Sequence, residues 1–527
     1  MKKDTTFEVS EYIRKATILY SSGKLTEAKR LAEKAVEIET ENASAHSILG
    51  ATYYGLGDMM NAVFHFERAC RLFVANKEYN KPTMMNFANS LIRFGRLKNA
   101  ISMLEDWQFI ADPDFTNRLN QVHAMRYEKI TKGLHDVFMH KSTDVIFGLM
   151  HSHRLGHLIM NTELLLRLIQ LGRLSKENKY ILIGSEYPAN KQLVDMYKRH
   201  LSIIENTELF TCFLNYKDAF STLEHYIDTY SLYDGTQYEE LNSTNTTISF
   251  TDEEEKKGVL ELEKIGIKNK DWFVCIFARD SEYLKVNAPN ADWSYHDYRD
   301  MDVNAYHKAI KFIIDKGGYV VRMGQIIGQK LNYRHKKMIH YGGSGLRSDF
   351  MDVYLSAKCR FYIGSPSGAS EIAATAFEVP VLTVNITPIG VKPLSKNALY
   401  IPQKLKQRVD NSYVSYPKIF NKFSSVEDLE SMLDGNKFRE SGYLYESNTE
   451  DEILDATIEM YQRVNSEYRP DAADQELLNS YFELYPENHF SRKNKTPIAL
   501  SFLKRNRELF LNKLNYLIYS DTRSTCR

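Results

Sequence analysis

The amino-acid sequence predicts an α plus α/β chain, in which a helical repeat precedes two Rossmann-like domains and a set of C-terminal helices. Small residues recur with a period of 34 over the first hundred residues. From residue 144 onward, short apolar runs alternate with patterns of helical period, and from Ser447 the pattern returns to helix alone. The expected domains are residues 1–140, 141–265, 266–445 and 446–527.

The composition is that of an ordinary globular protein, and it argues against several classes of function. Lys plus Arg and Asp plus Glu number 68 each, so the chain lacks the net positive field of a nucleic-acid-binding protein. No apolar run reaches the length of a transmembrane segment, and the polar N-terminus does not resemble a signal peptide. The five cysteines are scattered and form no C-x-x-C pair, which favours a reduced cytoplasmic protein without a zinc site. Because the last 40 residues are basic and aromatic, peripheral attachment to the inner membrane face is the alternative location.

The N-terminal repeat has the spacing of tetratricopeptide (TPR) helix pairs. Gly23, Ala28 and Ala35 recur 34 positions later as Gly57, Ala62 and Ala69, and an imperfect third copy follows. Small side chains at these positions let two antiparallel helices approach closely. TPR arrays bind protein in a concave groove, so we expect a protein partner here; the alternative is a cap that only packs on the next domain.

Two series of parallel strands follow the repeat. The first contains the expected strands Asp144–Leu149 and Lys179–Gly184 around a helix at Leu158–Gly172. A charged helix, Asp252–Ile265, separates it from the second series. That series has expected strands at Trp272–Phe277, Tyr319–Met323, Phe361–Ile363 and Val381–Val384, with helices at Tyr306–Lys316, Phe350–Ala357 and Ala369–Phe377. Two such halves are typical of paired Rossmann-like domains that face one cleft.

The strand ends of the second half predict a site for a diphosphate. Ligands of open parallel sheets bind at the carboxyl ends of the strands. Arg279 and Arg322 each lie at such an end, and a Ser/Gly-rich loop lies at a third, between a strand and a helix. Free N–H groups and hydroxyls in that loop would bind an anion, and the arginines would add bidentate contacts. The loop residues expected to bind the donor are Ser365, Ser367, Gly368 and Ser370. Helix capping and surface ion pairs are the structural alternatives.

Further candidates surround this clamp. Tyr341 and Asp349 are candidates for base and ribose contacts, although Asp349 would serve equally as a carboxylate at a helix N-terminus. Polar side chains of the loop Asp292–Asp300 suit a polyhydroxylated acceptor, together with two residues of the first half. These acceptor candidates are Tyr295, His296, Asp297, Arg299, Arg154 and Gly156. Asp300 and Asp302 form a D-x-D pattern, but Asp302 is better placed to cap the next helix, so no metal site is expected.

Several of these motifs, in this order, resemble a family of bacterial glycosyltransferases encoded in surface-polysaccharide gene clusters. The resemblance covers roughly residues 145–465, and its motifs are Arg154–His157, Asn161–Glu163, Arg279–Asp280, Ser294–Arg299, Arg322–Gly324, Ser348–Asp352, Gly364–Gly368 and Asn448–Ile453. That family is similar to the two-domain GT-B transferases and, more distantly, to O-fucosyltransferases. In the latter an arginine after the first strand of the C-terminal domain binds the donor diphosphate, which implies this role for Arg279. Phe277 stands where the fucosyltransferase pattern often has histidine, a departure that leaves the identity of the donor open, GDP-fucose included.

The residues and the resemblance together predict a metal-independent glycosyltransferase that uses a nucleotide-sugar donor and needs no cofactor. The acceptor would be a protein or a glycan, and the repeat would recruit it or a partner protein, as TPR modules fused to sugar transferases do. An inverting reaction needs a base for the acceptor proton, and the candidates are His157, Glu163 and Asp280. A retaining reaction, a nucleotide-sugar epimerase and a non-catalytic TPR scaffold with a degenerate transferase domain are the alternatives.

Overall fold

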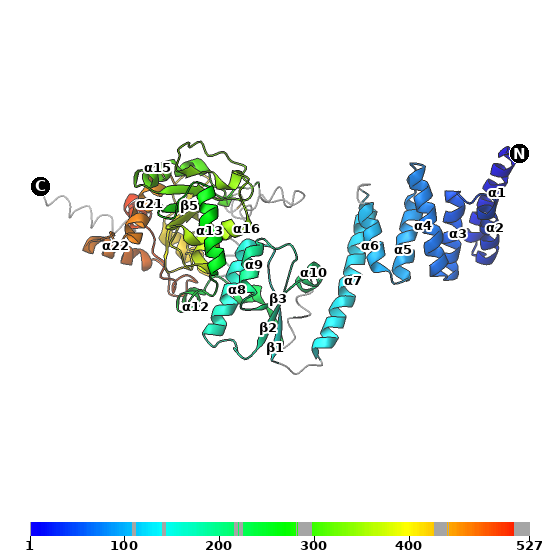
Figure 1. Cartoon of the computed structure of the whole chain (residues 1–527), viewed down its shortest axis with the longest axis horizontal. Coiled ribbons are helices and arrows are strands. Elements are labelled where there is room, and N and C mark those ends of the chain that lie inside the picture. Colours follow the sequence, from blue (N-terminus) through cyan, green and yellow to red (C-terminus); the bar gives the residue numbers. More distant parts are fainter. Residues whose placement is uncertain are drawn as a thin grey trace. The chain divides into compact units, whose positions relative to one another are not determined.

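The computed structural model describes residues 2–107, 112–139, 144–215, 220, 225–280, 282, 298–425, 440 and 442–510. The chain forms two compact units, residues 1–140 and residues 141–527, and each is described by itself (Figure 1). The first unit is helical, and the second contains parallel sheets covered by helices. This is the predicted α plus α/β architecture, a TPR-like helical repeat followed by a GT-B-like pair of Rossmann-like domains.

The first unit stacks helices pairwise, as the 34-residue repeat predicts. The small residues Ala28, Ala62 and Ala100 are fully buried where the helices approach one another. Gly57 ends its helix with φ of 84°, a left-handed conformation that glycine adopts without strain. The helices are α1 (Lys2–Ser21), α2 (Leu25–Ile38), α3 (Ala43–Leu56), α4 (Met59–Ala75), α5 (Lys81–Arg93), α6 (Leu97–Asp106) and α7 (Pro113–Met139).

The second unit begins with a parallel four-stranded sheet in the order β3-β2-β1-β4. Its strands are β1 (Val145–Leu149), β2 (Lys179–Gly184), β3 (Ser202–Glu205) and β4 (Tyr226–Asp228). Its helices are α8 (Leu155–Gln170), α9 (Lys191–Tyr197), α10 (Thr207–Asn215), η2 (Thr229–Leu232), α12 (Tyr238–Asn242) and the linking α13 (Asp252–Lys264). A capping box between Thr251 and Glu254 starts α13 and fixes where the linker becomes helical. We call this part the N-terminal α/β domain.

A parallel six-stranded sheet follows, in the order β10-β9-β8-β5-β6-β7. Its strands are β5 (Phe273–Phe277), β6 (Tyr319–Arg322), β7 (Met338–Ile339), β8 (Phe361–Gly364), β9 (Val381–Ile386) and β10 (Ala398–Pro402). The helical elements between them are η4 (Val303–Tyr306), α15 (His307–Asp315), η5 (Tyr341–Gly343), α16 (Asp349–Lys358), α17 (Gly368–Glu371) and its π-helical continuation η6 (Ile372–Ala376). We call this part the C-terminal α/β domain.

Successive residues of these strands pack on opposite faces of the sheet. Val274 and Ile276 of β5 belong to the core beneath α15, whereas Phe273 and Cys275 belong to the core beneath α16. Both faces are therefore apolar, which explains why the strands read as continuous apolar runs. The domain is a three-layer α/β/α sandwich.

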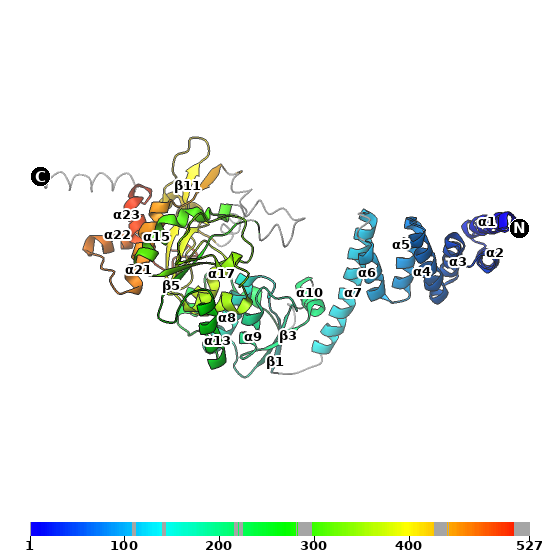
Figure 2. The ribbon, with the colours of Figure 1, turned by 45° about the horizontal axis from the view of Figure 1, so that its top comes forward.

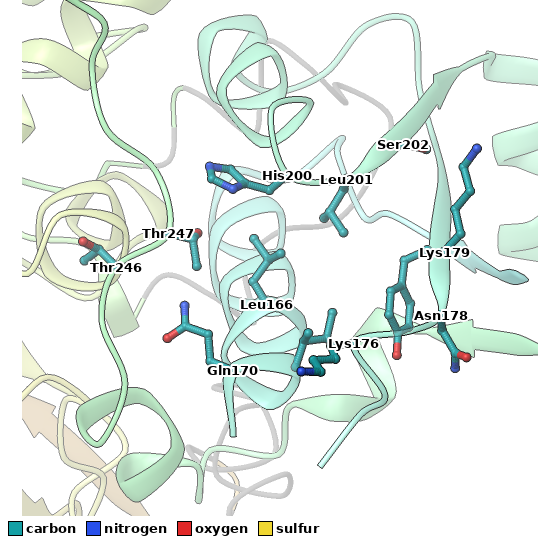
Figure 3. Close-up of a pocket in the computed structure, with 12 residues that line it drawn as sticks. Leu166, Gln170, Lys176, Asn178, Lys179, His200, Leu201, Ser202, Thr246 and Thr247 are labelled. Atoms are coloured by element: carbon teal, nitrogen blue, oxygen red, sulfur yellow. The ribbon is translucent and has the colours of Figure 1, made fainter. Parts of the chain in front are cut away.

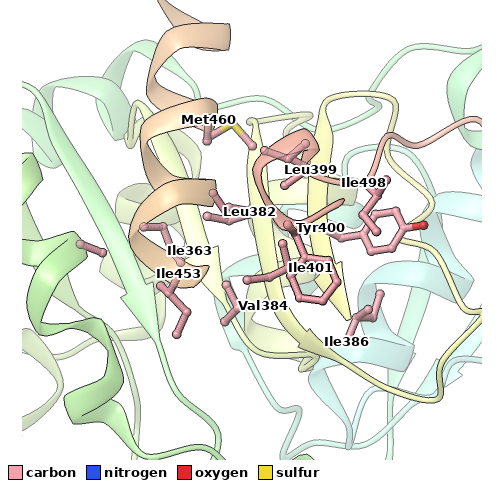
Figure 4. Packing of buried hydrophobic residues seen from close by; sticks show 14 of the residues in the cluster. Ile363, Leu382, Val384, Ile386, Leu399, Tyr400, Ile401, Ile453, Met460 and Ile498 are labelled. Carbon is pink, nitrogen blue, oxygen red and sulfur yellow. The ribbon is translucent and has the colours of Figure 1, made fainter. Parts of the chain in front are cut away.

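The C-terminal helices complete the larger of these cores. Ile453 and Met460 of α21 lie over Leu382 of β9 and Leu399 of β10 (Figure 4). Ile498 forms a bridge with Tyr400 and so extends the sheet beyond β10. The remaining elements are β11 (Lys404–Gln407), α18 (Tyr416–Lys422), β12 (Tyr443–Glu446), α21 (Glu450–Val464), α22 (Ala472–Phe482), α23 (Leu500–Arg505) and η7 (Arg507–Leu509). Residues 483–499 are not helical, so the basic side chains of this region do not share one helical face.

A buried contact joins the two α/β domains. Leu158 of α8 packs in one core with Val353 of α16 and Ile372 of η6. Arg167 of α8, only 1% exposed, donates to the backbone carbonyl of Thr375 and pairs with Glu378 across the contact. The domains are thus held together along α8 and η6, which sets the position of everything at the strand ends beside them. Within the part of the chain that the structure describes, no helix is long and apolar enough to cross a membrane.

Candidate functional site

Each of the two parallel sheets has one topological switch point, and each of these points is bridged by a side-chain contact. In the C-terminal domain the chain leaves β5 toward β6 on one side and later returns as β8 on the other. In the N-terminal domain β1 lies between β2 and β4 in the same way. Ligands of open α/β sheets bind outside the carboxyl ends of the strands at this point. A ligand is therefore expected at these two switch points.

Arg279 and Ser365 meet at the C-terminal switch point. The backbone N–H of Arg279, two residues after β5, donates to Oγ of Ser365 at 2.9 Å, directly after β8. The Arg279 guanidinium forms an ion pair with Asp300, and its side chain is 13% exposed. Arg299 donates to the carbonyl of Pro366 at 3.1 Å. Two guanidinium groups are thus fixed beside the predicted Ser/Gly loop.

The loop itself has an unfilled hydrogen-bonding capacity. Ser367 occupies the N-cap position of α17 in an extended conformation, yet its side chain forms no capping bond. Its buried Oγ has no partner among the described residues. Ser370 donates to the carbonyl of Ser367 at 2.8 Å. Because α17 continues into η6, free N–H groups and the positive end of a helix lie at Ser367–Ser370, as an anion site requires.

His151 and Asp228 meet at the N-terminal switch point. Nε2 of His151, two residues after β1, lies 2.9 Å from Oδ1 of Asp228, the last residue of β4. Both side chains are largely buried, with exposed fractions of 8% and 13%. The backbone N–H of Tyr230 donates to the same carboxylate at 3.0 Å and orients it.

Two more histidines surround His151. The ring centroids of His153 and His157 lie 6.0 and 6.2 Å from that of His151, and Tyr230 contacts both His151 and His157. Burial, and next the charge of His151, lower the pKa of His153 and of His157 from 6.5 to about 4. These two rings are neutral near pH 7, and His151 differs from both in having a carboxylate partner.

A close backbone contact brings the two switch points together. A Cβ added to Gly368 would lie 2.4 Å from the backbone nitrogen of Gly156, so only glycine fits there. Gly156 is the second residue of α8 and Gly368 the first of α17, and Figure 2 shows these helices side by side. Further along, Thr375 contacts Met160, so the helices run in the same direction with both N-termini at the shared edge. His157 and Ser367 are the neighbours of the touching glycines.

Glu163 is not part of this site, contrary to its prediction as a candidate base. It is fully buried on α8, where it pairs with Arg167 and accepts from Thr247 at 2.8 Å. Burial raises its pKa, against the charge of Arg167. Glu163 lies about two turns into α8 and faces the interior, so its contacts are structural.

Tyr341 and Asp349 also differ from their predicted roles. Tyr341 is fully buried, and its hydroxyl bonds to the backbone of Ser348, so its ring is not available to the base of a nucleotide. Asp349 accepts from the backbone N–H of Lys191 at 2.7 Å and so joins α16 to the start of α9. The structure agrees better with the alternative interpretation, because Asp349 is the first residue of α16 and places a carboxylate at the helix N-terminus.

Arg322 lies apart from the Ser/Gly loop. It donates to the carbonyl of Gln329 and lines a cavity of about 530 Å³ with Lys330, Arg334 and His340. Leu331, Asn332 and Tyr333 complete the lining, so the described walls carry basic and neutral groups without a carboxylate. Burial lowers the pKa of Arg322, and the negative charge of Asp280 opposes that shift.

The remaining predicted site residues lie in different parts of the structure. Asp280 accepts from the backbone N–H of Gly328 at 3.1 Å, in the segment between β6 and β7. Arg154, the N-cap residue of α8, is exposed. Arg299, predicted to bind the acceptor, lies beside the Ser/Gly-rich loop instead, because it donates to the carbonyl of Pro366. Tyr295, His296 and Asp297 lie outside the described residues.

Both carboxylates of the D-x-D pattern interact with other residues of the protein. Asp302 caps η4 by accepting from Asn304 at 2.9 Å, as predicted, and Asp300 pairs with Arg279. Among the residues described, no three His, Cys, Asp or Glu side chains are grouped so that they could hold a metal ion.

His151 and Asp228 were not predicted as site residues. His151 follows a correctly predicted strand at the same edge as His157, so the strand-end rule could have included it. Asp228 had no such signal, because β4 has only three residues and no periodicity.

A second cavity, of about 480 Å³, lies away from the site. Its lining includes Lys179 and Ser202, the first residues of β2 and β3, with Leu166 and Leu201 between polar side chains (Figure 3). It therefore opens at the amino edge of the sheet, opposite the edge where the histidines lie.

Comparison with known proteins gives likenesses of fold at low identity. No protein-family model and no curated protein matches the sequence. A glycosyl transferase of family 9 from Veillonella parvula is 11% identical, over 60% of this chain and 97% of that chain, with a TM-score of 0.37. ADP-heptose lps heptosyltransferase II of E. coli is 13% identical, over 56% and 99%, with a TM-score of 0.30. An O-GlcNAc transferase of Thermobaculum terrenum is 10% identical, over 96% and 98%, with a TM-score of 0.20. At these values the likenesses carry no conclusion about activity.

Proposed function

We propose that the chain is a glycosyltransferase that moves a sugar from a nucleotide-activated donor to a hydroxyl of a protein or glycan acceptor. The observation that carries the proposal is the C-terminal switch point, where Arg279 is bonded to Ser365 and the Ser367 hydroxyl is left without a partner among the described residues. A buried hydroxyl without a partner calls for an explanation, and a ligand oxygen supplies one.

The donor diphosphate would bind between the Ser365–Ser370 loop and the guanidinium groups of Arg279 and Arg299. Its oxygens would accept from the free N–H groups at the start of α17 and from Ser367. When the bond between sugar and diphosphate breaks, negative charge grows on the leaving oxygen. Fixed cations and N–H donors stabilise that charge without reorganisation, which is the electrostatic part of the catalysis.

The nucleoside would extend over β6 toward the Arg322 cavity. In Rossmann-like sheets the ribose of a dinucleotide lies at the end of the strand next to the first one, and β6 holds that place here. The basic lining at Arg322 and the ring of Tyr333 would contact the nucleoside end of the donor.

The acceptor would approach from the N-terminal domain, where the histidines face the same edge. A base there takes the proton of the acceptor hydroxyl while its oxygen attacks the anomeric carbon opposite the leaving diphosphate, which inverts the configuration. His157 remains a candidate for this base, whereas the buried Glu163 does not. The TPR-like repeat would recruit the acceptor protein or a partner.

Nucleotide binding tests the proposal. Melting of the full chain would be followed with GDP, UDP, CMP, ADP and dTDP, for the wild type, for Arg279→Met and for the surface variant Arg469→Met. A ligand of the folded state adds about 2.7 kcal/mol of stability at a hundredfold excess over its Kd. We expect one nucleotide to raise the melting temperature of the wild type and of Arg469→Met but not of Arg279→Met. No shift with any nucleotide would overturn the proposal and favour a scaffold role.

A further inference from the structure

The three histidines at the end of β1 differ in their surroundings. Only His151 has a carboxylate within hydrogen-bond distance, since Asp228 lies 2.9 Å from its Nε2. His153 and His157 contact aromatic rings and other histidines, and no described carboxylate is paired with either. The pairing with Asp228 therefore distinguishes His151 from the two other histidines of the same turn.

We infer that His151 and Asp228 form the dyad that takes the proton from the acceptor hydroxyl, an inference that rests on the proposed glycosyl transfer. With Nε2–H donating to Asp228, the lone pair of His151 lies on Nδ1, which makes no hydrogen bond to a described residue. Asp228 is held in turn by the backbone N–H of Tyr230 at 3.0 Å. The carboxylate therefore fixes both the tautomer and the orientation of the ring.

The three histidines also differ in the charges that surround them. The charged or titratable groups around His151 are Asp228, Arg154, Tyr230 and the rings of His153 and His157. A charge on His151 disfavours a second charge on either neighbouring ring. Because Asp228 is negative, an imidazolium at His151 is compensated, whereas one at His153 or His157 would not be.

The step balances within the proposed reaction. The acceptor O–H bond breaks and its proton moves to Nδ1 of His151. The acceptor oxygen forms a bond to the anomeric carbon, and the bond from that carbon to the diphosphate breaks with its electron pair on the leaving oxygen. Arg279, at the other switch point, offsets that charge. Asp228 does not touch the acceptor in this scheme and is a positioning residue.

The position of the dyad supports the role. It bridges β1 and β4 at the switch point of its own sheet, and the Gly156–Gly368 contact joins the α8 start, which follows the histidine turn, to the donor loop. Tyr230, 48% exposed, places an aromatic ring against His151 and His157. Such a ring suits the apolar face of a sugar, so an acceptor glycan would lie beside the base.

The test compares His151→Gln and Asp228→Asn with His153→Gln, which alters a histidine of the same turn that has no carboxylate partner. The full-length variants would be assayed for release of nucleoside diphosphate from UDP-, GDP-, ADP- and dTDP-linked sugars, with water as acceptor. General-base catalysis contributes roughly 10²- to 10⁴-fold. We expect kcat to fall by that range in the first two variants and by less than threefold in the third. Binding of the nucleoside diphosphate should be unchanged in all three.

Two further measurements separate catalysis from structure. The amide of Asp228→Asn still accepts from Tyr230, so this variant should fold even where His151→Gln does not. Imidazole added to His151→Ala should restore activity if the ring serves as a base. Equal activity of His151→Gln and His153→Gln would overturn the dyad and leave the transferase standing. A wild type that releases nucleotide from none of the donors would overturn both.

Discussion

Replacing Gly368 by alanine tests whether the touching glycines hold the two halves of the site in register. The new Cβ would lie 2.4 Å from the backbone nitrogen of Gly156 and 2.9 Å from its Cα. Non-bonded heavy atoms prefer about 3.5 Å or more, so α8 and α17 must separate by roughly 1 Å. Neither contact atom belongs to a flexible side chain that could turn aside. Overpacking of this kind costs about 1–3 kcal/mol of stability.

The effect on activity should exceed the effect on folding. A displacement of about 1 Å between reacting groups can lower a rate roughly 100-fold. We expect Gly368→Ala to remain folded in urea titrations followed by circular dichroism, while kcat for donor turnover falls by about two orders of magnitude. Gly133→Ala is the control, because a Cβ at this helical position has no atom within 4 Å. Gly368→Ala with wild-type kcat would refute the assigned contact.

Three further variants follow from the same geometry. Arg167→Ala leaves Glu163 buried without its partner and should cost roughly 3–5 kcal/mol in urea unfolding, whereas the exposed pair broken in Arg173→Ala should cost less than about 1 kcal/mol; equal losses would contradict the buried pairing. Ser367→Ala removes a hydroxyl without a described partner, so calorimetry should show weaker nucleotide binding at unchanged stability. Between pH 6.5 and 4 the unfolded chain binds a proton at His157 that the folded chain does not. The free energy of unfolding therefore decreases as the pH is lowered through this range, by up to about 1.4 kcal/mol per pH unit. His157→Gln should make that decline shallower, and an unchanged slope would contradict the lowered pKa.

The fold was predictable where the pattern was long or strongly periodic. The TPR-like helices follow from the spacing of Ala28, Ala62 and their equivalents, and the central strands follow from apolar runs buried on both faces. Strand β10 was not predicted. It ends in Pro402, and proline usually argues against a strand; here it is tolerated because Pro402 is the last residue of β10 and follows an irregularity in the pairing with β9.

The site was predictable only in part, for a physical reason. The strand-end rule identifies which edge of a sheet carries ligands, and it placed Arg279 and the Ser365–Ser370 loop correctly together. It does not say which way a side chain points, so Tyr341 and Asp349 entered the prediction although one is buried and the other joins two helices. The pairing of His151 with Asp228 depends on β1 and β4 lying side by side, a tertiary contact that local sequence does not reveal.

Donor turnover by the purified full-length chain tests the central claim most directly. Nucleotide sugars carrying the nucleotide that raises the melting temperature would be incubated with the wild type, with Arg279→Met and with Arg469→Met, and the released nucleoside diphosphate would be measured. The site described here predicts release by the wild type and by Arg469→Met, and a loss of at least about 100-fold in Arg279→Met. Release that is unaffected by Arg279→Met would contradict the assignment of the site to the C-terminal switch point.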